Sequence, residues 1–250
     1  MTSPIILYDI PGNAPECRAW SPNTWKVRLA LNYKGLPVKT EWVEYPDIEA
    51  LYKKLDIVPT ETQYDGKPYY CLPVINDQST KTIVADSFAI IQYLDKTYSE
   101  TPTLLPKGTL AFHAVFLSTW TAEVQLPTWR TACYPAWRRQ NARSQVYYRT
   151  TREANLGVPL EEVSSEEWWQ KSEKAWSKVE QWLQANGAGA DELVMGDEVC
   201  FADLHITAWI LYVRSTFGAD SDEWKRFKAW NGGRWVRYLE RFQRYEYIDS

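Results

Sequence analysis

The stretch Trp20–Leu31, WSPNTWKVRLAL, passes from a loop into a helix within a few residues. Pro22 suits the first position of a helix because proline has no N–H to leave unpaired there, which puts Ser21 just before the helix. The free N–H groups and the positive dipole end of the helix therefore point back toward Ser21. Two interpretations are open: Ser21 caps the helix or neighbours its cap, or it lies beside a bound anion.

The residues on both sides of this stretch predict alternating strands and helices. Apolar runs bounded by turn residues predict strands over 4–9, 38–45, 72–76 and 82–85, and helices over 24–33, 47–55 and 86–98. A parallel pair of strands joined by a helix and followed by a hairpin forms a four-stranded mixed sheet with helices on its faces.

From about residue 100 the pattern changes to helix alone. The segment 99–108, SETPTLLPKG, contains prolines that cannot continue a helix and is typical of a linker. The helical apolar spacing that follows extends over 110–134, 135–155, 165–186, 201–217 and 222–245, with breaks at Gly157, 187–189 and 232–233. The sequence therefore predicts a small α/β domain followed by a larger all-helical one.

Composition excludes several classes of protein. A net charge of −4 on 250 residues, with both signs interspersed, offers no basic surface for nucleic acid or anionic membranes. No apolar run approaches the roughly 20 residues needed to cross a bilayer, and no signal peptide is evident, so we expect a cytoplasmic protein. The four cysteines form no C-x-x-C pair and the two histidines have no second ligand at metal spacing, so we expect reduced thiols and no metal.

Two short motifs accompany Ser21. In Leu72-Pro73-Val74, proline falls at the start of a strand, where the chain stops pairing internally. If the Leu72–Pro73 bond is cis, the Leu72 backbone is free to pair with an extended peptide. Asp86-Ser87 lies at the start of the next helix, which suits the carboxylate and amine of an amino acid. Together these parts predict a site for a small anionic peptide that carries a thiol.

This succession of S-P-N-T-W-K-V-R helix, L-P-V hairpin, D-S helix and all-helical domain resembles the glutathione transferase family over essentially the whole chain. It is most similar to the serine-type transferases related to bacterial lignin β-etherases and their fungal relatives. The resemblance implies a thioredoxin-like glutathione-binding domain over 1–100, a linker over 101–108, and an all-helical domain over 109–250 that contributes the hydrophobic substrate site. It also implies a homodimer, with glutathione as co-substrate.

The resemblance also implies roles for individual residues. Ser21 stands where the family has its catalytic hydroxyl or thiol, Leu72 pairs with the cysteinyl unit of glutathione, and Pro73 is the cis-proline. Asp86 and Ser87 match the pair that holds the γ-glutamyl group. Candidates for the glycyl carboxylate are Lys53, Lys54 and Gln63, among which no motif chooses. Asn23 and Thr24 either add a donor to the sulfur or serve only the helix start.

The chemistry of this site follows from the thiol. A free thiol has a pKa of about 8.5, so little thiolate is present at neutral pH. A hydroxyl that donates to the sulfur and a helix dipole both favour the charged form, and a downward shift of about two units corresponds to roughly 2.7 kcal/mol. Glutathione is then the nucleophile and Ser21 its stabiliser.

The second substrate is expected to be hydrophobic. The chain has 14 Trp and 16 Tyr, which either pack in the core or line a pocket for flat ligands. The candidates for the pocket, whose helical spacing would equally place them in the core, are Trp20, Trp120, Val124, Trp129, Tyr134, Trp235 and Tyr238.

Three functions remain open. The first is conjugation of glutathione to aromatic or other hydrophobic electrophiles, with aryl ethers as candidates. The alternative is a ligandin-type protein that binds planar aromatics with weak turnover. Disulfide reduction is disfavoured because serine cannot form a mixed disulfide. Cys17, four residues before Ser21, is either a thiol that pairs with glutathione or an inert one.

Overall fold

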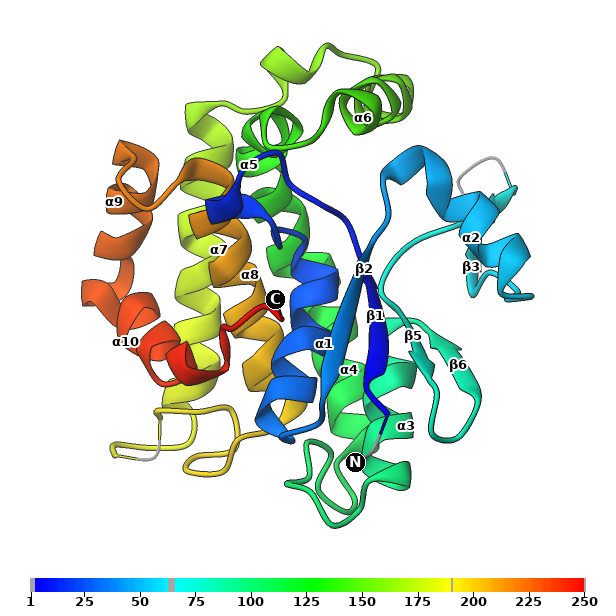
Figure 1. Cartoon of the computed structure of the whole chain (residues 1–250). Coiled ribbons are helices and arrows are strands. Elements are labelled where there is room, and N and C mark those ends of the chain that lie inside the picture. Colours follow the sequence, from blue (N-terminus) through cyan, green and yellow to red (C-terminus); the bar gives the residue numbers. More distant parts are fainter. Residues whose placement is uncertain (1–2, 63–65, 190, 250) are drawn as a thin grey trace.

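The computed structural model describes residues 3–62, 66–189 and 191–249. A four-stranded sheet lies on one side of the molecule and a bundle of helices on the other, with α1 between them (Figure 1). The strands are β1 (Ile5–Asp9), β2 (Val38–Trp42), β3 (Glu61–Thr62), β4 (Pro68–Tyr69), β5 (Val74–Asp77) and β6 (Thr82–Ala85). The helices are α1 (Pro22–Tyr33), α2 (Ile48–Lys54), α3 (Ser87–Thr97), α4 (Leu110–Trp120), α5 (Leu126–Arg138), α6 (Ala142–Leu156), α7 (Glu166–Gln184), α8 (Phe201–Phe217), α9 (Asp222–Ala229) and α10 (Arg234–Glu240).

The sheet confirms the predicted topology. Its strand order is β2-β1-β5-β6, with β1 parallel to β2 and antiparallel to β5, and β5 antiparallel to β6. All five residues of β1 are buried, as expected for a central strand covered on both faces. The short hairpin β3–β4 was not predicted, because two-residue strands leave no periodicity to detect.

The helical half matches the predicted sequence of helices except at two boundaries. A helix was predicted to begin at Pro135. Instead, α5 continues through that proline to Arg138, and the next helix, α6, begins at Ala142. Cys133 and Ala136, on either side of the proline, are fully buried, so packing holds the helix through it. Within the predicted helix 110–134, a π-helical turn at Thr121–Gln125 separates α4 from α5.

The C-terminal helical stretch divides where its two glycines predicted a break. Asn231, Gly232 and Gly233 have φ of 52°, 62° and 79°, a left-handed conformation that favours glycine. This turn separates α9 from α10. Beyond α10 the chain returns to α1 and the sheet (Figure 1).

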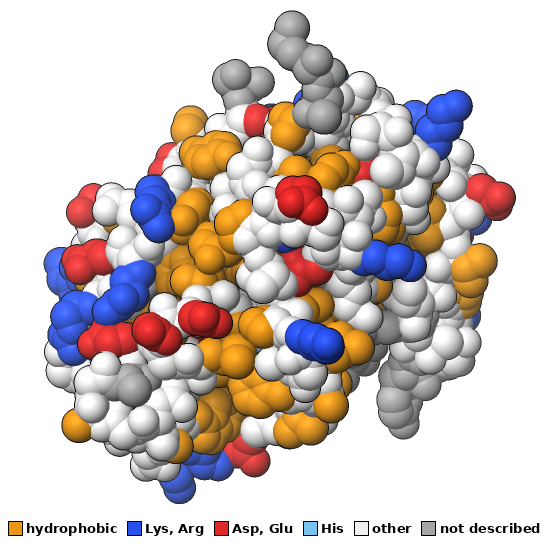
Figure 2. Space-filling model, turned by 90° about the horizontal axis from the view of Figure 1, so that it is seen from below, with side chains coloured by type: hydrophobic (Ala, Val, Ile, Leu, Met, Phe, Trp, Pro, Cys, Tyr) orange, Lys and Arg blue, Asp and Glu red, His pale blue; other side chains and the backbone are white. Residues whose placement is uncertain are grey.

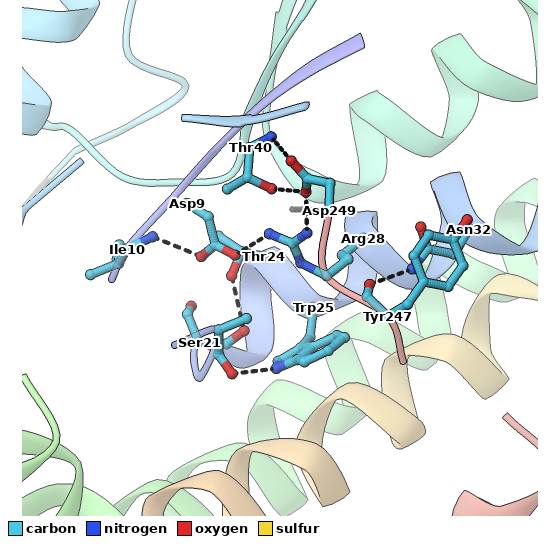
Figure 3. A network of polar contacts seen from close by, with 11 residues as sticks. Asp9, Ile10, Ser21, Thr24, Trp25, Arg28, Asn32, Thr40, Tyr247 and Asp249 are labelled. Carbon is cyan, nitrogen blue, oxygen red and sulfur yellow. Dashed lines mark hydrogen bonds and ion pairs between the residues drawn. The ribbon is translucent and has the colours of Figure 1, made fainter. Parts of the chain in front are cut away.

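A buried polar network fastens that returning segment (Figure 3). The Arg28 guanidinium pairs with Asp9 at 2.9 Å, with both side chains fully buried, and with Asp249 at 3.1 Å. Asp249 in turn accepts hydrogen bonds from the backbone N–H and the hydroxyl of Thr40 in β2. Asn32 of α1 donates to the carbonyls of two residues of the tail, at 2.7 and 2.9 Å. One cation thus ties β1, α1, β2 and the end of the chain together.

The segment between α3 and α4 is equally well anchored. The Asp95 carboxylate accepts hydrogen bonds from the backbone N–H groups of Leu104 and Leu105 and from the Lys34 ammonium at 2.7 Å. Leu104 is fully buried.

On the face seen in Figure 2, cations and anions are interspersed among hydrophobic side chains. None of the helices described is long and apolar enough to cross a membrane.

Candidate functional site

A cavity of about 440 Å³ lies between the start of α1, the segment before β5, and helices α5, α6 and α8. Its lining includes Ser21 and Asn23 from the start of α1 and Leu72 from the segment before β5. Among the residues described, no cluster of His, Cys, Asp and Glu is suited to hold a metal ion.

Ser21 occupies the N-cap position of α1 but its hydroxyl does not cap the helix. Its backbone has φ −66° and ψ 126°, and no hydrogen bond joins its side chain to the first turn. The helix start is instead closed by the Ser21 carbonyl, which accepts from the Thr24 hydroxyl at 3.1 Å (Figure 3). The same carbonyl accepts from the backbone N–H of Trp25 at 3.0 Å. The Ser21 hydroxyl therefore takes no part in closing the helix, and the residue lines the cavity.

Asn23 and Thr24 differ in position. Asn23 lines the cavity, and its side-chain oxygen accepts from the Lys26 ammonium at 2.9 Å. Thr24 is fully buried and its hydroxyl bonds within the helix start. Of the two interpretations given for Thr24, the geometry favours the structural one.

The Leu72–Pro73 bond is cis. The ladder between β1 and β5 ends at Val74, so Leu72 lies beyond it, and Leu72 lines the cavity. Because Ala85 is paired with Val74, the next residue, Asp86, lies at the same edge of the sheet as Pro73.

Asp86 has a φ of 77°, and its carboxylate accepts from the N–H groups of Phe88 and Ala89, both at 2.9 Å. This caps α3 and holds Ser87 at its first position. Pro73, Asp86 and Ser87 lie outside the lining of the cavity.

The candidates for the glycyl carboxylate are not brought together. The Lys53 ammonium pairs with Glu49 one turn away at 2.7 Å, on a side chain that is 69% exposed. Neither Lys53 nor Lys54 lines the cavity. Gln63 lies outside the described residues.

Of the predicted hydrophobic residues, only Trp20 and Trp129 line the cavity. The other five candidates do not line the cavity. Helical spacing shows which face of a helix is apolar but not whether that face packs against the core or lines a cavity. Trp120 and Trp235 both pack edge-on against Trp176, with ring centroids 5.6 and 4.8 Å apart. Fully or nearly fully buried in the core are Trp120, Val124, Trp235 and Tyr238.

The side chains of Tyr238 and Tyr134 do not line the cavity, and each contacts a specific residue elsewhere. The Tyr238 hydroxyl donates to the buried Asp203 carboxylate at the start of α8. Tyr134 stacks on Trp137, with centroids 5.5 Å apart and rings 17° from parallel.

The sequence analysis missed most of the aromatic lining. The missed residues include Tyr69 and Tyr70 and a group that we call the aromatic wall, which is Tyr45, Tyr147, Tyr148, Trp209 and Tyr212. Tyr45 stacks on Tyr147 with centroids 5.7 Å apart and rings 9° from parallel, and meets Tyr148 edge-on at 5.8 Å. Adjacent tyrosines on the otherwise polar helix α6 were the one pattern that pointed to this wall.

Arg152 of α6 lies against this wall and was also missed. Its guanidinium carbon is 4.4 Å from the ring centroid of Tyr148 and 5.3 Å from that of Tyr45. One of its nitrogens donates to the Thr151 hydroxyl at 2.9 Å. Burial raises the pKa of both Tyr45 and Tyr148, so these phenols stay protonated and cannot neutralise the cation.

Cys17 does not meet the cavity. The side chain is fully buried, and its thiol lies near the carbonyl of Ala14 at 3.5 Å. Burial raises its pKa above the ordinary value. Of the two interpretations given for Cys17, the geometry therefore favours the inert thiol, since an inaccessible, protonated thiol is a poor nucleophile.

Comparisons with known proteins agree across the chain. The family model for the Glutathione S-transferase N-terminal domain matches residues 20–97, and that for the C-terminal domain matches residues 111–245. The structure is similar to that of glutathione transferase GSTFuA3 from Phanerochaete chrysosporium, with a TM-score of 0.97, 46% identity and 100% of both chains covered.

A second similar structure contains a ligand. It is the glutathione S-transferase CsGST63524 of Ceriporiopsis subvermispora in complex with glutathione, with a TM-score of 0.95, 41% identity, and 99% of this chain and 100% of that one covered. Among curated proteins, the glutathione S-transferase-like protein ustS of Aspergillus flavus is 32% identical over 168 residues. That match spans 64% of this chain and 59% of the relative, which is less than two thirds of the relative's length.

Proposed function

The chain belongs to the glutathione S-transferase family, and from that premise we propose that the Ser21 hydroxyl stabilises the thiolate of glutathione for attack on aromatic or other hydrophobic electrophiles. The observation that carries the proposal is the placement of Ser21. It stands at the start of α1, lines the cavity, and makes no side-chain hydrogen bond to the helix. A hydroxyl in this position can donate to a sulfur anion while the helix dipole adds to its stabilisation.

Glutathione binding is assigned to the edge that carries the cis-proline. The Leu72 backbone, which lies beyond the β1–β5 ladder, pairs with the cysteinyl unit, and Pro73 fixes its direction. Asp86 and Ser87 hold the γ-glutamyl group at the start of α3, and Asn23 offers an amide near the sulfur. The complex of the similar CsGST63524 with glutathione supports glutathione as the ligand.

In the reaction, the thiolate sulfur attacks an electrophilic carbon and forms a carbon–sulfur bond. With an aryl ether, the bond from that carbon to oxygen breaks and the phenolate leaves. With an α,β-unsaturated compound, the electron pair moves to the activating group and is protonated there. Ser21 keeps its proton throughout, because its role is to donate a hydrogen bond to the sulfur.

An alternative function is supported by the aromatic wall. A cavity with so many aromatic rings suits a ligandin-type protein that binds planar aromatics with weak turnover. The two functions differ in what glutathione does, since an enzyme needs the thiolate and a binding protein does not.

The test is a pH titration of the thiolate absorbance of bound glutathione, together with the rate of conjugation to 1-chloro-2,4-dinitrobenzene. In Ser21→Ala we expect the thiol pKa to rise by about two units and the rate to fall about 10²-fold, with glutathione still bound. Thr24→Val is the matched control, since that hydroxyl bonds within the helix start. An equal thiol pKa in wild type and Ser21→Ala would overturn the proposal in favour of the binding protein.

The family resemblance further implies a cytoplasmic homodimer. We propose this assembly, and sedimentation velocity across a range of protein concentrations tests it. A single species with the mass of one chain at all concentrations would contradict it.

A further inference from the structure

Arg152 is a cation at the cavity without an anion of its own. Among the described residues, no carboxylate lies within ion-pairing distance of its guanidinium, whereas Arg149 on the same helix pairs with both Glu153 and Glu161 at 2.7 Å. Arg152 faces the aromatic wall instead, over the rings of Tyr45 and Tyr148. The two rings attract the cation, but they do not neutralise its charge, so it can still bind an anion.

The guanidinium is also held in place. Its nitrogen donates to the Thr151 hydroxyl at 2.9 Å, and that hydroxyl donates to the Tyr147 carbonyl at 2.8 Å. The other N–H donors of the side chain have no hydrogen-bond acceptor among the described residues, and Arg152 lines the cavity. Their planar fork matches the two oxygens of a carboxylate.

A second unpartnered donor lies on the same wall. Tyr212 of α8 is 1% exposed and lines the cavity, and its hydroxyl has no hydrogen-bond partner among the described residues. A buried hydroxyl without a partner costs free energy, and a ligand oxygen would remove that cost.

From these observations we infer that the second ligand of the cavity is an aromatic carboxylate. Its ring lies among the rings of the aromatic wall, and its carboxylate binds Arg152, with Tyr212 as an additional donor. The inference rests on the proposed function, because it names the substrate or ligand class of the same cavity. It assigns to the ligand, and not to glutathione, the anion that Arg152 lacks.

The experiment compares two probes of nearly the same shape, trans-cinnamate and its methyl ester, by isothermal titration calorimetry with and without saturating glutathione. Wild-type protein is expected to bind cinnamate at least about tenfold more tightly than the ester, since hydrogen bonds to charged groups contribute about that much. Equal affinities in wild type would overturn the inference without reliance on any variant.

Variants then locate the preference. Arg152→Gln should bind the two probes equally while glutathione affinity is unchanged, and Arg152→Lys should keep part of the preference because it keeps the charge but not the fork. Arg149→Gln is the matched control on the same helix and should keep the full preference. If Arg152→Gln weakens glutathione binding and leaves the cinnamate preference intact, the inference is wrong and Arg152 serves the tripeptide.

The proposed function fails separately. Turnover of the neutral 1-chloro-2,4-dinitrobenzene does not need an anion site, so it reports on the transferase activity alone. Arg149→Gln, which lies outside the lining of the cavity, should conjugate it at the wild-type rate. Wild-type protein that prefers cinnamate but never conjugates this electrophile would contradict the transferase proposal and leave the anion site standing.

Discussion

Two arginines of this chain, Arg28 and Arg152, differ in whether a carboxylate neutralises their charge. Arg28 in α1 is fully buried between the carboxylates of Asp9 and Asp249. Arg152 in α6 is half-buried beside tyrosine rings, with no carboxylate among the described residues to pair with it. The first cation is neutralised by its own chain and holds the sheet, α1 and the tail together. The second is left without a counter-charge at a cavity, where a ligand can supply one.

The difference teaches how to separate architecture from binding. Both residues are arginines taken at least partly out of solvent, so residue type does not distinguish them. The partners of the donor groups distinguish them. A donor that already has a protein acceptor cannot bind a ligand, whereas a donor without one can. The same distinction applies to Tyr238, bound to Asp203, and Tyr212, which has no partner among the described residues.

The largest effect is expected when a carboxylate that pairs with Arg28 is removed. Asp9→Ala leaves the buried Arg28 without its fully buried partner and should lower the free energy of unfolding by about 3–5 kcal/mol. Urea denaturation followed by circular dichroism measures it. The double variant Asp9→Leu/Arg28→Met should recover much of the loss, since the fully buried pair is then removed from both sides and Asp249 keeps its hydrogen bonds from Thr40. A loss below about 1 kcal/mol for Asp9→Ala would mean that the pair is not structural.

A milder test compares the two buried tyrosines of the helical half. Tyr238→Phe removes a donor from the buried Asp203 and should lower the free energy of unfolding by about 1–3 kcal/mol. Tyr212→Phe removes a hydroxyl without a partner and should be nearly neutral. The same denaturation experiment checks both, and equal losses would show that the Tyr212 hydroxyl is bonded in solution.

The tail carboxylate gives a pH-dependent test. Burial raises the pKa of Asp249, but hydrogen bonds from Thr40 and the charge of Arg28 outweigh it, so the net pKa lies below its ordinary value. A depressed folded-state pKa contributes stability above the unfolded value, about pH 4, and the contribution is lost as the pH falls through the folded value. Asp249→Asn should therefore cost about 1 kcal/mol at pH 7 and progressively less below pH 4. Thermal melts of wild type and Asp249→Asn at pH 7 and below pH 4 test this prediction. A stability difference between the two proteins that does not change with pH would contradict it.

The smallest expected effect is at the open arginine. Arg152→Gln removes no ion pair, so its free energy of unfolding should stay within about 0.5 kcal/mol of wild type. Arg149→Gln, which loses partly exposed pairs with two glutamates, should cost about as little or slightly more. A large loss for Arg152→Gln would place this residue with Arg28 as a structural cation.

Local patterns predicted most of the fold. The parallel pair of strands, the hairpin, the helix starts near Pro22, Ser87 and Phe201, and the break at Gly232-Gly233 were all predicted from residues close together in sequence. The errors arose where distant packing decides, as at Pro135, where buried neighbours on α5 carry the helix through a proline.

The site was predictable where it depends on the start of one helix or strand. Ser21, Asn23 and Leu72 were identified because proline and helix-start rules act within a few residues. The aromatic wall was not, because it assembles from a turn after β2 and from α6 and α8, which are far apart in the sequence. Helical spacing showed which residues turn inward but not whether they meet the core, as Trp120 and Trp235 do, or the cavity.

The unbonded hydroxyl of Ser21 has a consequence for how this enzyme can evolve. Folding makes no demand on that oxygen, because the start of α1 is closed by a carbonyl and by Thr24. Exchange of oxygen for sulfur, Ser21→Cys, should therefore leave the fold intact. On the proposed function, it replaces a hydroxyl that stabilises the glutathione thiolate with a thiol that attacks a glutathione disulfide, forms a mixed disulfide and releases the other half as a thiolate. One codon would then separate the proposed reaction from thiol–disulfide exchange on an unchanged scaffold.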